Sequence, residues 1–242
     1  MTTLPDTGER MIPTAEGELS VVFARHRFTY EYALQFAEHK RVLDVGCGTG
    51  YGSKLLAARA SSVLGLDQDT NAISYSREHS GAQNIRFVQG NAEELAFRDE
   101  FDVAVSFQVI EHVDDTDDFV RRIKEAVKTG GTILLTTPNA RDKGTRPSDN
   151  PFHVNEMNHR EFSELLTRHF TSFELLGIGY AAPSRLRSIV QRSPLYALGR
   201  YLKRRSPIKK FADRALNLTD YAIVSTNVER DAIDLLAVCR KI

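Results

Sequence analysis

The sequence contains few of the residues that mark several large classes of protein. Cysteine occurs only twice in 242 residues, as Cys47 and Cys239, which stand far apart and in no metal-ligand spacing. This argues against a disulfide-framed secreted protein and against a zinc site built from cysteines. No apolar run approaches the roughly 20 residues that cross a bilayer, and the start of the chain lacks the pattern of a signal peptide. We therefore expect a soluble, cytoplasmic protein without a transmembrane segment.

A surplus of charge is also lacking. Lysine and arginine total 32, aspartate and glutamate total 32, and the formal net charge is zero. A dedicated nucleic-acid binder would need a basic surplus, so no nucleic-acid partner is expected, although a local basic patch is compatible with these totals. Hydrophobic residues make up 41% and charged residues 26%, which permits a substantial core and excludes an intrinsically disordered chain. The length suits one α/β domain spanning residues 1–242.

Short apolar runs alternate with segments of helical character through the first 140 residues. Near-continuous apolar runs of this length are typical of strands buried on both faces of a sheet. Their alternation with helices predicts βαβ units, and we expect a Rossmann-like, doubly wound α/β fold with a mostly parallel, seven-stranded sheet. The predicted strands are 41–46, 62–67, 85–90, 101–107 and 132–137, and the predicted helices between them are 52–60, 70–79 and 118–128.

The flanking parts of the chain have other patterns. Residues 1–40 form a predicted N-terminal helical segment before the core at 41–140. Residues 141–160 are polar and rich in turn formers, and we expect them to be a substrate loop. A helix over 161–169 precedes two last strands at 173–179 and 233–240, expected to pair antiparallel at the edge of the sheet.

The remaining insertion, residues 181–230, is too long for a plain loop, and we expect a helical cap over the site. Residues 183–212 carry nine basic side chains and no acidic one, interleaved with apolar residues. Three interpretations stay open for this stretch: the solvated face of a cap helix, a contact for anionic acceptors, or a membrane-surface patch. The first is favoured.

A glycine cluster directly after the first predicted strand carries the clearest chemical signal. Residues 44–50 read Asp-Val-Gly-Cys-Gly-Thr-Gly, and glycines let a backbone approach a ligand closely. The dinucleotide pattern G-x-G-x-x-G is broken, because Tyr51 and Ser53 stand where its third glycine should fall. Asp67 ends the second strand about 20 residues further on, where a carboxylate can accept hydrogen bonds from two ribose hydroxyls. An adenosine-bearing cofactor other than NAD is therefore favoured.

Five segments in this order resemble the class I S-adenosylmethionine-dependent methyltransferases of the type 11-like group. They are LDVGCGTG (43–50), VLGLD (63–67), QGNAEELAF (89–97), FDVAVSFQVIEHV (101–113) and GGTILLTTPN (130–139). The resemblance implies S-adenosylmethionine as the cofactor. The flanking segments TGERMIP and NPFHVNEM resemble a bacterial subgroup linked with the modification of sugars or polysaccharides.

The resemblance also implies a role for individual residues around the cofactor. The glycine loop would hold the methionine part of the cofactor, and Asp67 would bind the ribose hydroxyls. The residue after Asp67 and two residues after the third strand would contact the adenine. Two residues at the end of the fourth strand would line the floor of the cofactor site. The residues of the glycine loop are Asp44, Gly46, Cys47, Gly48 and Gly50, and the ribose residue is Asp67. The adenine residues are Gln68, Asn91 and Ala92, and the floor residues are Phe107 and Gln108. Arg25 and Arg27 would either pair with the cofactor carboxylate or be solvated charges on an N-terminal helix.

Methyl transfer to a hydroxyl is helped by a base, and histidine is the natural candidate near neutral pH. His112 follows the fourth strand, and His153 lies in the polar loop, so both are predicted as catalytic bases; a structural role for His112 is equally compatible. The acidic cluster at 114–118 could bind Mg²⁺ together with Glu111 or His153. Helix capping explains that cluster better, and no metal site is predicted.

The acceptor is a small molecule or a glycan, and a sugar hydroxyl is the first choice. An anionic or lipid-linked acceptor would suit the basic stretch, and the nearest alternative is a quinone-like or lipid precursor. From different classes, an NAD-dependent enzyme and a non-catalytic nucleotide-binding module are the competing hypotheses. Assembly into a homo-oligomer is compatible with the sequence.

Overall fold

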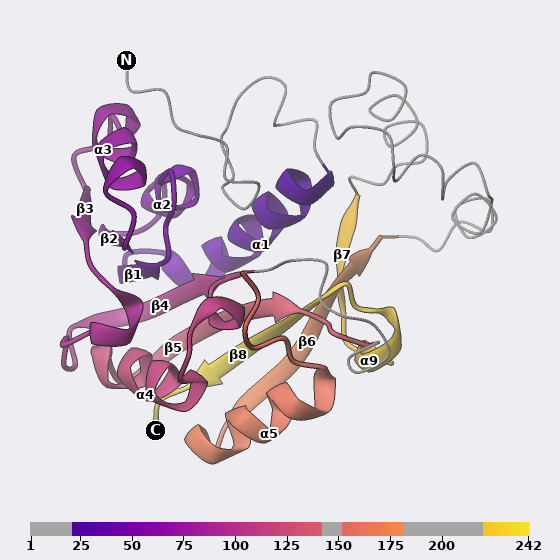
Figure 1. Cartoon of the computed structure of the whole chain (residues 1–242). Coiled ribbons are helices and arrows are strands. Elements are labelled where there is room, and N and C mark those ends of the chain that lie inside the picture. Colours follow the sequence, from indigo (N-terminus) through magenta and orange to yellow (C-terminus); the bar gives the residue numbers. More distant parts are fainter. Residues whose placement is uncertain (1–20, 142–151, 182–219) are drawn as a thin grey trace.

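The computed structural model describes residues 21–141, 152–181 and 220–242. They form an eight-stranded sheet in the order β3-β2-β1-β4-β5-β8-β6-β7 (Figure 1). Strands β1 to β5 run parallel, β8 is antiparallel to both β5 and β6, and β7 is antiparallel to β6. The strands are β1 Arg41–Val45, β2 Ser62–Asp67, β3 Ile85–Gln89, β4 Phe101–Phe107, β5 Val127–Pro138, β6 Phe173–Tyr180, β7 Tyr221–Val224 and β8 Asp234–Arg240.

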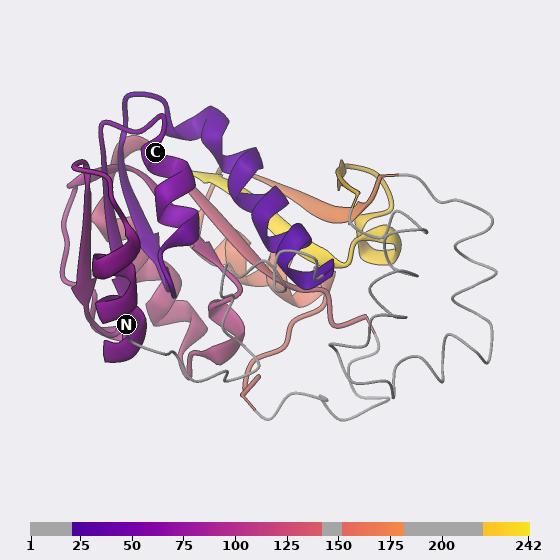
Figure 2. The same ribbon diagram turned by 90° about the horizontal axis from the view of Figure 1, so that it is seen from above.

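Helices cover both faces of this sheet, and the view from above places α1 and α5 on opposite sides (Figure 2). Alternate residues of one strand serve the two faces, because successive side chains of a strand point in opposite directions. In β5, Leu134 packs in the core beneath α1 and α2, whereas Ile133 and Leu135 pack in the core beneath α4 and α5. The helices are α1 Val21–Ala37, α2 Tyr51–Ala57, α3 Thr70–His79, α4 Thr116–Ala126, α5 His159–His169 and α9 Val228–Asp231, with short 3₁₀ turns η1 Ala92–Glu94 and η2 Ile110–His112.

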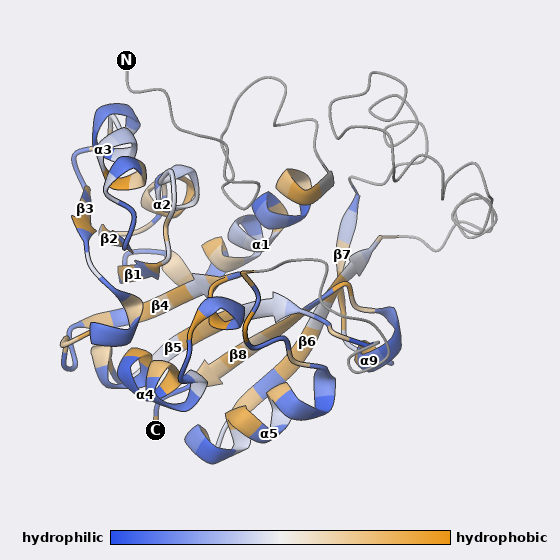
Figure 3. Ribbon diagram, in the orientation of Figure 1, coloured by the Kyte–Doolittle hydropathy of each residue, from blue (hydrophilic) through white to orange (hydrophobic). Residues whose placement is uncertain are grey.

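The hydropathy of the elements follows from these layers. The central strands are largely hydrophobic, while the helices carry hydrophilic residues on their outer faces (Figure 3). In α4, Phe119, Val120 and Ile123 are buried, whereas Arg121 and Arg122 between them are more exposed. None of the helices in the described ranges is both long and apolar enough to cross a membrane.

The predicted α/β fold is confirmed, and two details of the sheet were wrong. The sheet has eight strands rather than seven, because β7 lies within the 181–230 segment that was expected to be a helical cap. The C-terminal strand β8 is antiparallel as predicted, but it lies between β5 and β6, and β7 occupies the edge. With only four residues, β7 pairs with Gly177–Tyr180, and this tertiary pairing rather than a long apolar pattern makes it a strand. The basic stretch 183–212 lies outside the described residues.

Candidate functional site

A cavity of about 740 Å³ opens at the carboxyl ends of the parallel strands. Its walls come from the first turns of α1, from the segments that follow β1 to β5, from residues 152 and 153, and from the first residue of β8. Open α/β sheets bind ligands at this edge. Eleven of the thirteen predicted site residues line the cavity: Gly46, Cys47, Gly48, Asp67, Gln68, Asn91, Ala92, Phe107, Gln108, His112 and His153.

The glycine loop bends tightly at the floor of this cavity. Gly46 and Gly48 have φ angles of 77° and 53°, in the left-handed region that glycine adopts without strain. A Cβ on Gly46 would lie 2.3 Å from Cγ2 of Val109, so the loop also approaches the segment after β4 too closely for a side chain. The amide of Gly46 donates to the carbonyl of Leu66 over 2.8 Å, which ties the loop to the end of β2.

Asp67 lies at the point where β2 meets this loop. Its Oδ2 accepts a hydrogen bond from the Gly48 amide over 2.8 Å, and its Oδ1 accepts one from the Asp69 amide over 2.9 Å. The carboxylate is therefore held in place by backbone amides while it lines the cavity. An ionised carboxylate offers about four lone-pair sites, so further donors can be accepted on the same oxygens.

The residues after β3 and β4 complete this part of the wall. The Oδ1 atom of Asn91 accepts from the Glu93 amide over 3.0 Å and begins the 3₁₀ turn η1. The Gln108 side chain donates to Oγ1 of Thr136 over 3.3 Å, and the backbone of Gln108 has a positive φ of 59°. Both residues follow the end of a strand and line the cavity.

Asp44 and Gly50 are the two predicted cofactor residues that do not line the cavity. Asp44 is fully buried, and its carboxylate accepts hydrogen bonds from the Tyr30 hydroxyl over 3.0 Å and from the Ser53 hydroxyl over 2.5 Å. Burial raises the pKa of Asp44 to about 7, against the lowering effect of those two hydroxyls. Gly50, with φ 76°, begins α2 and approaches Phe87. Both residues thus lie on the core side of the glycine loop, away from the cavity.

Helix α1 brings residues to the cavity that sequence reasoning did not assign there. His26 lines it, and its Nδ1 shares a hydrogen bond with the hydroxyl of Tyr51. Burial lowers the pKa of His26 to about 4, although a backbone hydrogen bond with Phe107 opposes this. The sequence predicted only a helical segment within residues 1–40, and this prediction does not reveal which turn of the helix reaches the site.

Arg25 also lines the cavity, but its Nε lies 2.7 Å from Oδ2 of Asp234, the first residue of β8. Burial raises the pKa of Asp234 above its ordinary value, and the guanidinium of Arg25 opposes that rise. Arg27, the other predicted partner of a cofactor carboxylate, instead pairs with Glu31 one turn along an exposed face of α1. Asp234 was missed because the sequence marks it only as an acid at the start of an apolar run.

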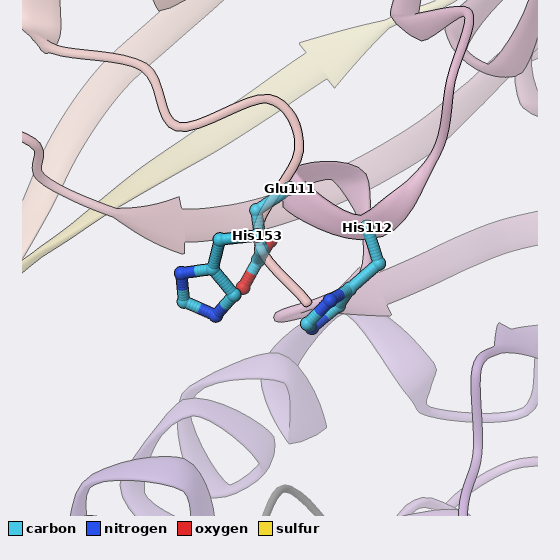
Figure 4. Close-up of side chains that lie close together, drawn as sticks. All are labelled: Glu111, His112 and His153. Carbon is cyan, nitrogen blue, oxygen red and sulfur yellow. The ribbon is translucent and has the colours of Figure 1, made fainter. Parts of the chain in front are cut away.

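His112, His153 and Glu111 meet on one wall of the cavity (Figure 4). One possible ligand atom from each of the three lies within 4.8 Å of the others. Glu111 and His112 end the turn η2, whereas His153 lies 41 residues further along the chain, in the predicted substrate loop. The two imidazole rings meet edge to face with centroids 4.9 Å apart. The two predicted base candidates therefore belong to one cluster.

The acidic cluster at 114–118 serves the helix that follows it. Asp115 is the N-cap of α4, and its Oδ1 accepts from the Asp118 amide over 2.9 Å. Asp118 pairs with Arg121 and Arg122 on the same helix. The helix-capping interpretation of this segment is confirmed. In the described part of the chain, the grouping of side chains suited to a cation is the one formed by Glu111 and the two histidines.

The fold and the cavity together are those of an α/β protein with a ligand site at the carboxyl ends of its parallel strands. Residues 43–135 match a family model described as a methyltransferase domain. A probable S-adenosylmethionine-dependent methyltransferase of Mycolicibacterium smegmatis is 39% identical over 183 residues, which is 74% of this chain and 70% of the relative. A probable S-adenosylmethionine-dependent methyltransferase of Mycobacterium tuberculosis is 32% identical over 245 residues, covering 96% of this chain and 88% of the relative.

The chain therefore belongs to the S-adenosylmethionine-dependent methyltransferases, and S-adenosylmethionine is its cofactor. A ubiquinone biosynthesis O-methyltransferase of Azorhizobium caulinodans is 35% identical over 130 residues, covering 52% of this chain and 51% of that protein. Among solved structures, a possible histamine N-methyltransferase of Thermotoga maritima superposes with a TM-score of 0.60 at 18% identity, covering 91% and 92% of the two chains. At that identity the likeness concerns the fold alone.

Proposed function

We propose that this methyltransferase transfers its methyl group to a hydroxyl oxygen of a small-molecule acceptor, with a sugar hydroxyl as the first choice. The observation that carries this proposal is that one cavity is lined both by the glycine loop with Asp67 and by the cluster of Glu111, His112 and His153. The first group suits an adenosine-bearing cofactor. The second group suits an acceptor that must lose a proton.

The residues around the cavity fit the cofactor in shape and in chemistry. Asp67 is fixed by two amide hydrogen bonds and supplies the carboxylate that would accept the ribose hydroxyls. The positive φ angles of Gly46 and Gly48 bend the loop where it lines the cavity, and neither residue adds a side chain there. We assign the adenine to Gln68, Asn91 and Ala92, and the floor of the site to Phe107 and Gln108, all of which line the cavity.

The cofactor supplies a methyl group that is already activated by its positively charged sulfur. The chain must align the acceptor oxygen with that methyl group and exclude water, and alignment contributes about 7–11 kcal/mol to lowering such barriers. As the oxygen lone pair forms the new C–O bond, the C–S bond breaks and its electron pair stays on sulfur. The hydroxyl proton leaves to a base. His153 is the first candidate for that base, because Oε1 of Glu156 lies 2.8 Å from its Nδ1 and orients the ring.

A phenolic or quinone-like acceptor is the second candidate. It is favoured by the likeness to the ubiquinone biosynthesis O-methyltransferase and by Phe152, which lines the cavity with 58% of its surface exposed. Aromatic side chains stack on flat apolar acceptors. Both acceptor classes present a hydroxyl to the same cluster, so the type of reaction is unchanged.

A methyl-transfer screen separates these acceptors. The protein would be incubated with radiolabelled S-adenosylmethionine and with panels of nucleotide sugars, free glycans, catechols and primary amines. We expect label in a sugar or glycan fraction and its loss when the reactive hydroxyl is replaced by hydrogen. Label confined to the catechol panel would move the assignment to the second candidate. Label confined to amines would contradict O-methylation.

A further inference from the structure

The cluster of Glu111, His112 and His153 has the composition of a metal centre. It combines one carboxylate with two imidazoles, and their possible ligand atoms lie within 4.8 Å of one another (Figure 4). Ligands of a tetrahedral zinc ion at about 2.0–2.2 Å lie roughly 3.3–3.6 Å apart, so small side-chain movements would complete the geometry. Glu111 is only 1% exposed, so this carboxylate lies within the wall of the cavity rather than in bulk solvent.

The chain holds these two segments together independently of any ligand. The carbonyl of Glu111 accepts hydrogen bonds from the amides of Val154 and Asn155 over 2.9 Å and 3.0 Å. The Asn155 side chain donates back to the carbonyl of Val113 over 2.5 Å. His153 is therefore fixed beside the turn η2 by its own neighbours. Such preorganisation lets side chains act as ligands without ordering a loop first.

Both histidine rings are oriented by a partner at Nδ1. Nδ1 of His112 lies 2.9 Å from the carbonyl oxygen of Phe152, which can only accept, so this nitrogen carries the proton. Nδ1 of His153 lies 2.8 Å from Oε1 of Glu156. In the neutral rings this leaves the lone pair on Nε2. Metal-ligating histidines typically donate their other N–H to a carbonyl or a carboxylate in this way.

We propose that Glu111, His112 and His153 bind one divalent transition-metal cation on the wall of the methyl-transfer cavity. Two imidazoles and one carboxylate favour Zn²⁺, Mn²⁺, Fe²⁺ or Co²⁺ over Mg²⁺, which prefers an all-oxygen shell. Three protein ligands leave coordination positions open, and centres of this kind bind water or substrate there. Glu156 is a positioning residue that acts through His153.

The role of this cation rests on the proposed O-methylation. An acceptor hydroxyl that coordinates the open position becomes more acidic, as water does on zinc, where its pKa falls to about 7. Its proton then passes to solvent, and the resulting alkoxide attacks the methyl group. With the cation bound, the lone pair of His153 is engaged as a ligand. The cation therefore replaces His153 as the means of removing the proton.

Direct cation binding tests the site without any acceptor. The full chain, without a histidine tag, would be stripped with EDTA, dialysed and titrated with Co²⁺, whose visible absorption reports its ligands; Zn²⁺ would then compete. We expect one Co²⁺ per chain. The variants are His112→Asn and His153→Asn, because the asparagine amide keeps a donor near the position of Nδ1 and lacks the Nε2 lone pair. Each should weaken Co²⁺ binding more than about tenfold.

The matched control is His79→Asn, an exposed histidine on α3 outside the cavity. It should bind Co²⁺ as the unchanged protein does. Glu111→Gln should weaken binding as the histidine variants do. The proposal would be overturned if the three ligand variants bound Co²⁺ as tightly as the His79→Asn control. It would also be overturned if the unchanged protein gave no Co²⁺ absorption.

S-adenosylhomocysteine binding by calorimetry separates this failure from failure of the proposed function. If the protein binds S-adenosylhomocysteine normally but binds no cation, the proposed cation site is contradicted and the proposed O-methylation stands. If the protein binds the cation but transfers label only to amines, the proposed O-methylation is contradicted and the proposed cation site stands. The cation proposal also requires activity on a hydroxyl acceptor to fall after EDTA treatment and to return with Zn²⁺, Mn²⁺, Fe²⁺ or Co²⁺.

Discussion

The Oδ2 atom of Asp67 lies 2.8 Å from the amide nitrogen of Gly48, and this hydrogen bond joins the end of β2 to the glycine loop after β1. One carboxylate thereby shapes the loop and faces the cavity. The two features that sequence reasoning treated as separate cofactor contacts are thus one structural unit.

Replacing Asp67 should therefore weaken cofactor binding in two ways. Asp67→Ala removes the proposed acceptor for the ribose hydroxyls and releases the Gly48 amide. Charge-assisted hydrogen bonds are worth about 1.5–3 kcal/mol each, so the Kd for S-adenosylhomocysteine should rise roughly ten- to hundredfold or more. Asp67→Asn keeps one carbonyl oxygen and should give an intermediate Kd by calorimetry. An unchanged Kd in the alanine variant would contradict the assignment.

Gly46→Ala should also weaken S-adenosylhomocysteine binding. The added Cβ would lie 2.3 Å from Cγ2 of Val109, at a backbone φ of 77° that alanine adopts only with strain. Overpacking of this kind costs about 1–3 kcal/mol, and we expect a lower midpoint of thermal unfolding as well. The double variant with Val109→Ala removes the clash but keeps the strain, so it should recover stability in part. Full recovery would show that the positive φ is unimportant.

Asp115→Ala should separate helix capping from cation binding. Loss of the hydrogen bond to the Asp118 amide should reduce the free energy of unfolding by about 0.5–2 kcal/mol, measured by urea denaturation. Asp115→Ser retains a capping oxygen and should lose less. Co²⁺ binding should be unchanged in both variants, because the proposed ligands lie outside the acidic cluster. A weaker cation affinity in either variant would show that the acidic cluster at 114–118 contributes to cation binding.

The sheet core could be predicted because its strands are buried on both faces. Val42 to Val45 are all buried, so the sequence shows a continuous apolar run interrupted only by Asp44. The strand β7 could not be predicted in this way, since three of its four residues are only half-buried and its partner β6 lies 40 residues earlier. Its existence depends on tertiary pairing rather than on local pattern.

The lining of the cavity by the glycine loop and Asp67 was largely predictable, whereas the contact between His112 and His153 was not. Gly46, Gly48 and Asp67 are placed by a local strand–turn–helix unit whose spacing is fixed by the backbone. Asp44 was also predicted as a cofactor residue, but its carboxylate accepts a hydrogen bond from Tyr30 in the core and does not line the cavity. His153 is held beside His112 by hydrogen bonds from its loop neighbours to Glu111 and Val113, and no spacing rule encodes such contacts.

His153→Ala should lower turnover while leaving cofactor affinity intact. Whether His153 acts as a base or as a cation ligand, its loss removes the means of deprotonating the acceptor, and we expect kcat to fall about 100-fold or more. The Kd for S-adenosylhomocysteine should stay within about twofold, because His153 belongs to the proposed acceptor wall. His79→Ala serves as the control with unchanged kcat. The opposite pattern, a raised Kd at normal kcat, would place His153 in the cofactor site.

The pH dependence of stability should reveal two buried groups that oppose each other. Burial raises the pKa of Asp44 from 3.8 to about 7, so folded Asp44 holds a proton that the unfolded chain has lost, and its contribution to stability falls as the pH rises through this range. Burial lowers the pKa of His26 from 6.5 to about 4, so its contribution rises with pH over nearly the same range. The shift of Asp44 corresponds to roughly 4 kcal/mol.

The two slopes largely cancel in the unchanged protein, and single variants should expose them. Between pH 4 and pH 7, the free energy of unfolding of Asp44→Asn should increase more steeply with pH than that of the unchanged protein, because the contribution of His26 is no longer opposed by Asp44. In His26→Asn, the free energy of unfolding should instead decrease as the pH rises over the same range. Urea denaturation at several pH values measures both slopes, and the double variant, which lacks both groups, controls for the remaining titrating residues. Parallel pH profiles for the two single variants would show that these groups do not titrate as their burial requires.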